Sequence, residues 1–95
     1  MDTRELFERY GDAVFRLAWS CTGSRQDAEG VTQTVFLKVL ELKAGEREIL
    51  YLIYYEGFST RETASLLGIS QTAVTTRLQR ARKKLRERLE EEGRP

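Results

Sequence analysis

Apolar residues recur every three or four positions over the first 42 residues, which is the period of an amphipathic helix. One stripe predicts a helix over residues 3–20 with Thr3 as its cap, and a second predicts a helix that begins after Ser24 and extends to residue 42. Gly23 is suited to end the first helix. The stripes consist of Leu6, Tyr10, Val14 and Leu17, followed by Ala28, Val31, Val35, Val39 and Leu42. A connection this short predicts an antiparallel hairpin of two helices.

The second half of the chain predicts three more helices, after a short junction at residues 43–45. They extend over residues 46–56, 60–67 and 71–91. Gly57 ends the first of them, and Ser59 opens the second through a capping box with Glu62. A glycine turn follows, and Ser70 caps the last helix. The apolar stripe of that last helix is Val74, Leu78, Ala81, Leu85 and Leu89.

These elements predict an all-α fold, because sustained alternation of apolar and polar residues is absent. Residues 1–43 are expected to form an N-terminal two-helix hairpin, and residues 44–95 a three-helix helix-turn-helix domain. A hairpin of this size cannot bury its apolar stripes alone, so it packs on the second half or pairs with a second copy. We favour a homodimer through the hairpin, since bacterial helix-turn-helix proteins often act as dimers. The aromatic residues assigned to the hairpin core are Phe7, Phe15, Trp19 and Phe36.

A short helix, a glycine-containing turn and a longer helix form the helix-turn-helix pattern. The small and apolar residues that lock the two helices stand at the expected spacing: Ala64, Leu67, Gly68, Ile69, Val74 and Leu78. The outer face of the longer helix carries side chains suited to base edges in the major groove: Gln71, Thr72, Thr75, Thr76, Gln79 and Arg80. The phosphate contacts expected beyond them are Arg77, Arg82, Lys83 and Lys84. We therefore expect this helix to bind double-stranded DNA, with an inert structural motif as the alternative.

Charge supports this interpretation only locally. The net charge of the chain is +1, which by itself implies no partner, but residues 77–88 carry seven basic side chains and one acidic one. Such a run is either a solvated helix face or a phosphate-binding surface. Its place on the second helix of the motif favours phosphate binding.

The residue inventory excludes several classes of function. The chain has no histidine, which removes imidazole metal ligands and the commonest general base. Its single cysteine, Cys21, cannot form an internal disulfide and is consistent with a reducing compartment. Its apolar runs are too short for a membrane span. The sequence thus predicts a cytoplasmic protein that is not an enzyme, with no catalytic residues, no metal, no cofactor and no membrane contact.

Several segments of the chain carry a resemblance to a known family. Residues 45–59, 62–64, 67–70, 73–74 and 77–82 read GEREILYLIYYEGFS, ETA, LGIS, AV and RLQRAR. They resemble region 4 of bacterial sigma factors of the sigma-70 family, in particular the extracytoplasmic-function (ECF) branch. Residues 6–11, 14–18 and 27–37 read LFERYG, VFRLA and DAEGVTQTVFL, and they resemble the first part of region 2. Together the two stretches cover nearly the whole chain.

The resemblance implies roles for individual residues. Region 4 binds the −35 promoter element and the flap of RNA polymerase, and its base-reading positions correspond to Thr75, Thr76, Gln79 and Arg80. Its phosphate contacts correspond to Thr60, Arg61, Ser70, Thr72, Arg77 and Lys83. The first part of region 2 binds the clamp of the polymerase core, through positions that correspond to Asp27, Glu29 and Gln33. Anti-sigma factors bind region 4 in this family and are a further expected partner.

The chain departs from the family in its middle. Residue 42 runs straight into region 4, so the linker and the part of region 2 that recognises and melts the −10 element are missing. Gly30 and Thr34 stand where the family usually has acidic residues. The resemblance implies a sigma-factor-like transcription regulator that reads a −35-type promoter element and does not melt promoters alone. The alternatives are a true sigma factor reduced to its ends, which needs another protein or the missing region for −10 recognition, and a protein-interaction module that acts as a decoy for RNA polymerase or an anti-sigma factor. An effector domain of the response-regulator kind is a further alternative.

Overall fold

Helical segments follow one another along residues 2–92, the part of the chain that this computed structural model describes. In chain order they are α1 (Thr3–Thr22), α2 (Arg25–Leu40), α3 (Ala44–Leu50), η1 (Tyr51–Tyr55), α4 (Thr60–Leu67) and α5 (Gln71–Glu92). No strand occurs within residues 2–92, and the all-α fold class is confirmed. The second expected domain covers residues 44–95, and its last three residues, 93–95, lie outside the described part.

The hairpin of α1 and α2 forms around the turn that the sequence predicts. Gly23 has a φ of +73° and its N–H donates to the carbonyl of Trp19 at 2.8 Å, which ends α1. The hydroxyl of Ser24 accepts the N–H of Asp27 at 3.2 Å and opens α2. The predicted cap of α1 was wrong by one residue. Asp2 caps the helix, since its Oδ1 accepts the N–H of Glu5 at 2.9 Å, and its negative charge suits the positive end of the helix dipole.

The junction and the third predicted helix differ from expectation. α2 ends at Leu40 instead of residue 42, and the next helix begins at Ala44 instead of residue 46. From Tyr51 to Tyr55 this helix widens to a π-helical turn, in which the N–H of Glu56 donates to the carbonyl of Tyr51 at 3.0 Å. The stop at Gly57 is confirmed, with a φ of +80°.

The helix-turn-helix has the helix caps and the glycine turn that the sequence predicts. Ser59 and Glu62 form the predicted capping box, with two reciprocal hydrogen bonds of 3.0 Å between their side chains and backbone N–H groups. Gly68 turns the chain with a φ of +68°. The hydroxyl of Ser70 then accepts the N–H of Ala73 at 3.0 Å and caps α5.

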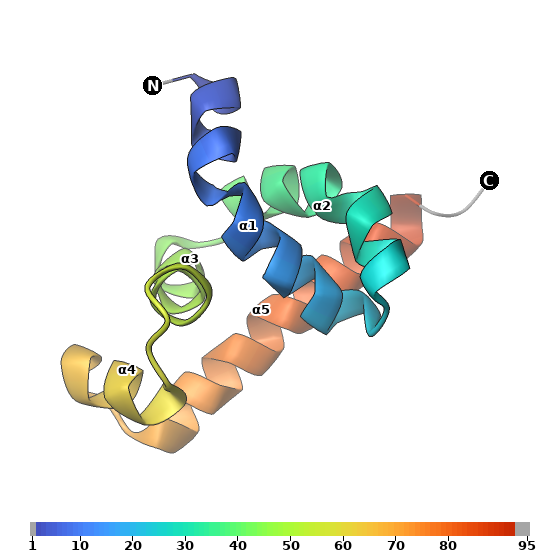
Figure 1. Cartoon of the computed structure of the whole chain (residues 1–95). Helices are drawn as coiled ribbons and strands as arrows, with labels where there is room; N and C mark the ends of the chain where they lie inside the picture. Colours follow the sequence, from blue (N-terminus) through green and yellow to red (C-terminus); the bar gives the residue numbers. More distant parts are fainter. Residues whose placement is uncertain (1, 93–95) are drawn as a thin grey trace.

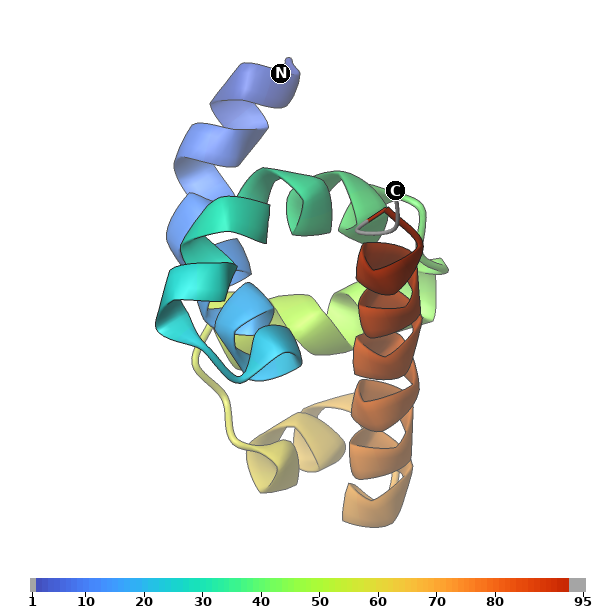
Figure 2. The ribbon, with the colours of Figure 1, turned by 90° about the vertical axis from the view of Figure 1, so that its right-hand side faces the viewer.

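One hydrophobic core joins the hairpin to the second half of the chain, as Figures 1 and 2 show from two sides. Leu17 and Val35 of the hairpin are buried in the same cluster as Ile49, Val74 and Leu85. The side chain of Arg16, on α1, reinforces this contact by donating to the carbonyl of Tyr54 in η1 at 2.6 Å. Of the two alternatives for the hairpin, packing on the second half is therefore the one observed. A homodimer through the hairpin stays a prediction.

The aromatic residues of the hairpin do not all belong to this core. Phe36 is buried, and Phe7 and Phe15 pack against the core while remaining partly exposed. The assignment of Trp19 was wrong, because 43% of its surface is exposed. It lies on the flank of α1 next to the buried Ala18, and the guanidinium of Arg25 lies over its ring at 5.9 Å. Periodicity places a residue near a helix stripe but does not tell which flank a neighbouring helix covers.

Thr63, on α4, is a polar residue in the core. It is fully buried, and its hydroxyl has no hydrogen-bond partner among the described residues. An unsatisfied buried hydroxyl loses its hydration without compensation, whereas valine has nearly the same shape and no polar group. We therefore expect Thr63→Val to raise the free energy of unfolding by about 1 kcal/mol, measured by urea denaturation. The control is Thr72→Val at an exposed position of α5, and an equal gain there would contradict the explanation.

Candidate nucleic-acid interface

α4 and the first turns of α5 protrude from the end of the molecule that lies away from the hairpin (Figures 1 and 2). The inner face of α5 is fixed by its buried residues Val74, Leu78, Ala81 and Leu85. The hairpin packs on this inner face, toward the C-terminal half of the helix, so it leaves the outer face open. The motif therefore offers a free, convex helix surface of the kind that enters a major groove.

The five residues that share the outer face all belong to the predicted site. At 100° per residue, Thr72, Thr76, Gln79 and Lys83 lie opposite the buried stripe, and Arg80 lies beside them. Gln79, Arg80 and Lys83 are exposed, and Thr76 is half-buried. This face combines an amide and a guanidinium that can each make two hydrogen bonds to a base edge.

Thr75 is the predicted base-reading residue that differs most from the rest. It is half-buried and lies at the edge of the outer face. Its hydroxyl donates to the carbonyl of Gln71 one turn earlier, at 3.1 Å. The hydroxyl proton is thus engaged within the helix, and the Thr75 oxygen is left with acceptor capacity only.

The predicted phosphate contacts gather mainly at two neighbouring helix starts. Thr60 and Arg61 open α4, and Ser70 and Thr72 lie at the start of α5. The amide of Gln71 donates to the hydroxyl of Thr60 at 3.0 Å and fixes one start against the other. Both helix N-termini contribute partial positive charge, which favours a phosphate near them. Sequence reasoning placed Gln71 among the base readers and missed this positioning bond.

The basic run at residues 77–88 does not form one continuous surface. Lys84 pairs with Glu46 of α3 at 2.8 Å. Arg82 is half-buried, with a buried Nε that has no partner among the described residues, and Arg86 lines a hollow beside Cys21 and Asp27. The phosphate contacts expected at Arg82 and Lys84 stay predictions, and a phosphate at Lys84 would have to compete with its ion pair to Glu46. Within residues 2–92, Arg77, Arg80 and Lys83 are exposed and make no ion pair.

The ion pair of Glu46 with Lys84 ties α3 to α5. The hydrogen bond from Lys84 holds the pKa of Glu46 below its ordinary value. Such a carboxylate stabilises the fold above its ordinary pKa of about 4.3, and the contribution is lost as the pH falls through the lower folded-state pKa. We expect Glu46→Gln to lower the unfolding free energy by about 0.5 kcal/mol near neutral pH and by less as the medium becomes acidic, since solvent screens the half-exposed Lys84. Urea titrations at several pH values measure this, with Glu48→Gln as the exposed control; a constant difference across the pH range would contradict it.

The three residues expected to bind the polymerase clamp lie on α2 but do not share one face. Glu29 and Gln33 are exposed and one turn apart, and Glu29 pairs with Arg25 at 3.7 Å. Asp27, also exposed, lies on another side of the helix, toward Arg86. The structure thus brings two of these side chains together and separates the third.

The remaining chemistry of the chain is sparse. No cluster of three metal-ligating side chains exists within the described part, and no helix there is long and apolar enough to span a bilayer. Cys21 is buried, and this burial raises the pKa of its thiol. A buried thiol of this kind reacts slowly.

Comparison with known proteins matches both parts of the chain. Residues 35–85 match the family model described as sigma-70, region 4, and residues 6–44 match the model described as sigma-70 region 2. The chain is 40% identical over 67 residues to the RNA polymerase sigma-E factor of Streptomyces avermitilis, which covers 70% of this chain and 36% of the relative. It is 54% identical over 43 residues to the probable RNA polymerase sigma factor RfaY of Xanthomonas campestris pv. campestris, which covers 45% of this chain and 11% of the relative. No solved structure has significant similarity to the chain.

Proposed function

Because the chain belongs to the sigma-70 family, with a relative of the ECF sigma-E type, we propose that it is a sigma-factor-like transcription regulator that reads a −35-type promoter element through α5. The sigma-70 family consists of non-enzymatic transcription initiation factors. The chain spans about a third or less of the length of the two relatives described above. The proposed function therefore rests on the surface of this chain itself.

The observation that carries the proposal is the free outer face of α5. Gln79 and Arg80 are consecutive exposed residues on the side of α5 that faces away from its buried stripe. An arginine here can bond both acceptors of a guanine, and a glutamine can bond both groups of an adenine. Arg77 and Lys83 supply positive charge next to these readers, without competing ion pairs within residues 2–92. Together they satisfy the requirements of sequence-specific binding, which needs base contacts for selection and phosphate contacts for position.

The proposal includes a limit, namely that the chain does not melt promoters alone. The two family matches overlap from residue 35 to residue 44, where region 4 begins before region 2 has ended. Only residues 41–43 connect α2 to α3. No chain length is left there for helices that capture an unpaired strand. Opening of the duplex would then require another protein.

Selection of bound duplexes from a random pool tests the proposal. The full chain is incubated with the pool at near-physiological salt, and the retained duplexes are sequenced. Enrichment of a defined motif supports the proposal, and a single or paired half-site gives the stoichiometry. Retention without a motif leaves phosphate binding only and contradicts the reading of bases. If no duplex is retained, the decoy hypothesis replaces the proposal, and its own test is capture of core polymerase in the absence of DNA.

A further inference from the structure

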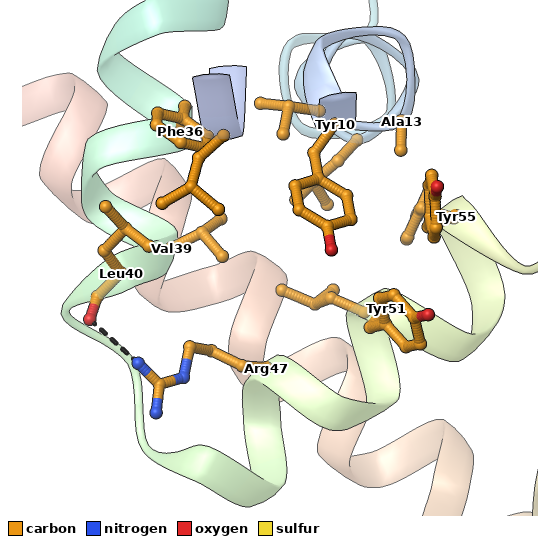
Figure 3. Close-up of a pocket in the computed structure, with 13 residues that line it drawn as sticks. Tyr10, Ala13, Phe36, Val39, Leu40, Arg47, Tyr51 and Tyr55 are labelled. Carbon is orange, nitrogen blue, oxygen red and sulfur yellow. Dashed lines mark hydrogen bonds between the residues drawn. The ribbon is translucent and has the colours of Figure 1, made fainter. Parts of the chain in front are cut away.

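A concave site lies between the hairpin and η1, and none of the residues that line it belongs to α5 (Figure 3). Its volume is about 210 Å³, and its walls come from α1, α2, α3 and η1. The lining is apolar throughout, because it consists of aliphatic and aromatic side chains and the aliphatic stem of Arg47. An apolar cavity of about 150 Å³ is enough to hold benzene. This site therefore has room for one aromatic ring with a short chain attached.

Large apolar side chains remain exposed around its mouth. Leu40 is 43% exposed, Tyr51 is 41% exposed and Tyr55 is 36% exposed. These three are half of the large apolar residues that are exposed in the described part of the chain. Exposed apolar side chains that gather around a hollow, rather than scatter over the surface, are typical of a ligand site.

The tyrosine wall of this site is formed by the π-helical turn. Three tyrosines of η1, Tyr51, Tyr54 and Tyr55, all line the hollow. Tyr10 faces them from α1, with its ring 4.8 Å from that of Tyr55 in an edge-to-face arrangement (Figure 3). π-helical turns are rare and occur frequently at functional sites, because the widened turn places side chains where a regular helix would not. We call this site the tyrosine pocket, after Tyr10, Tyr51, Tyr54 and Tyr55.

The tyrosine pocket has a different polarity at its two ends. The guanidinium of Arg47 lies at the rim near Leu40, outside the apolar lining, where its Nη1 donates to the Leu40 carbonyl at 3.2 Å (Figure 3). It makes no ion pair within residues 2–92, so the rest of its fork of N–H donors is free for a ligand. At the other end the hydroxyl of Tyr51 donates to the carboxylate of Glu56 at 2.6 Å. The guanidinium of Arg9 lies 5.5 Å from the centre of the Tyr10 ring, so the tyrosine end has both a cation and the Glu56 carboxylate beside it. An anionic ligand group is therefore favoured at Arg47, which has no carboxylate paired with it within residues 2–92.

We propose that the tyrosine pocket binds a small aromatic carboxylate, with its ring against Tyr10, Tyr51 and Tyr55 and its carboxylate on Arg47. Edge and face contacts among aromatic rings hold the ring. The planar guanidinium holds the carboxylate through charge-assisted hydrogen bonds, which are stronger than those of a neutral amide. Since the ligand touches both α1 and η1, its binding adds a contact between the hairpin and the helix-turn-helix half.

The test compares 3-phenylpropionate with its neutral amide on the full chain, by titration followed in ¹⁵N–¹H correlation spectra. We expect saturable shifts of backbone amides in α1 and η1, and binding of the acid about ten-fold tighter than that of the amide. Absence of saturable shifts with either compound would overturn the proposal. Equal affinity for acid and amide would do the same, because the charged end would then have no role. No DNA enters this measurement, so its failure leaves the proposed DNA reading unaffected.

Two kinds of variant sharpen the test. Arg47→Gln is expected to weaken binding of the acid to the level of the amide and to leave the amide unchanged, whereas the exposed control Arg25→Gln changes neither. Val39→Phe fills the pocket and is expected to abolish binding of both compounds. Ala13→Val is a smaller change on the α1 wall, and it serves as the filling variant in case Val39→Phe disturbs the fold. It is expected to weaken binding of both compounds. Unaltered acid binding in Arg47→Gln, or in both filling variants, would contradict the assignment.

Discussion

Replacing Arg80 with alanine is expected to weaken binding to the selected duplex by about 5- to 150-fold, which corresponds to the roughly 1–3 kcal/mol of a good side-chain pair to a base. The guanidinium is exposed on the outer face of α5 and makes no ion pair within residues 2–92, so the substitution removes a DNA contact without leaving a partner unpaired inside the protein. Affinity for scrambled duplexes should fall much less. Fluorescence anisotropy with the two duplexes measures the ratio.

Lys83→Ala is the matched control, since Lys83 is equally exposed on the same helix but is assigned to a phosphate. It should weaken binding to the selected and the scrambled duplex alike. It should also reduce by about one the slope of the logarithm of affinity against the logarithm of salt concentration. If both variants lower affinity for the two duplexes by the same factor, Arg80 does not read a base. If neither variant changes affinity, α5 is not the binding surface.

Leu85→Ala is expected to lower the free energy of unfolding by about 2–5 kcal/mol, the range for removing most of a buried leucine. Leu85 is 1% exposed and lies on α5 in the core that the hairpin shares. Such a loss is a large fraction of the roughly 5–15 kcal/mol that stabilises a domain. Leu66→Ala, which makes the same change at a position that is 61% exposed, should alter the free energy by less than about 0.5 kcal/mol.

Two probes decide whether the core is shared in solution. Far-UV circular dichroism follows all the helices, while fluorescence of Trp19, the only tryptophan, follows the hairpin. Urea transitions that coincide for the two probes, and shift together in Leu85→Ala, are expected of one cooperative unit. If the urea midpoint of the Trp19 fluorescence stays unchanged in Leu85→Ala while that of the circular dichroism shifts, the two halves fold independently.

The helix ends were predictable because their signals are local. Ser24, Ser59 and Ser70 cap the helices that the sequence assigns to them, and Gly23 and Gly68 adopt the positive φ that a chain reversal there requires. A cap depends on a few neighbouring residues, so it can be read directly from the sequence. The cap of α1 was predicted at Thr3 instead of Asp2 because Asp and Thr both cap helices well and these two residues are adjacent.

Features that depend on neighbouring helices could not be predicted. In the sequence the seven basic residues of 77–88 look alike, and only the position of α3 against α5 pairs Lys84 with Glu46. The π-helical turn at Tyr51–Tyr55 has no signature in a helical stripe, because its residues follow the same apolar pattern as an α-helix. The exposure of Trp19 likewise depends on which flank of α1 remains uncovered. The outer face of α5 was nevertheless predictable, because it is the complement of a well-defined apolar stripe.

Because the core is shared, α5 stays folded only as long as the hairpin packs on it. α5 owes its buried face to side chains of α1 and α2 as well as to those of α3 and α4. A small domain with one core loses its parts together, so an opening of the hairpin would also release α5. In a cell, a protease that cleaves within the first 40 residues would thereby end DNA binding by α5. The time for which the protein stays active would then depend on a segment that we expect to touch no DNA.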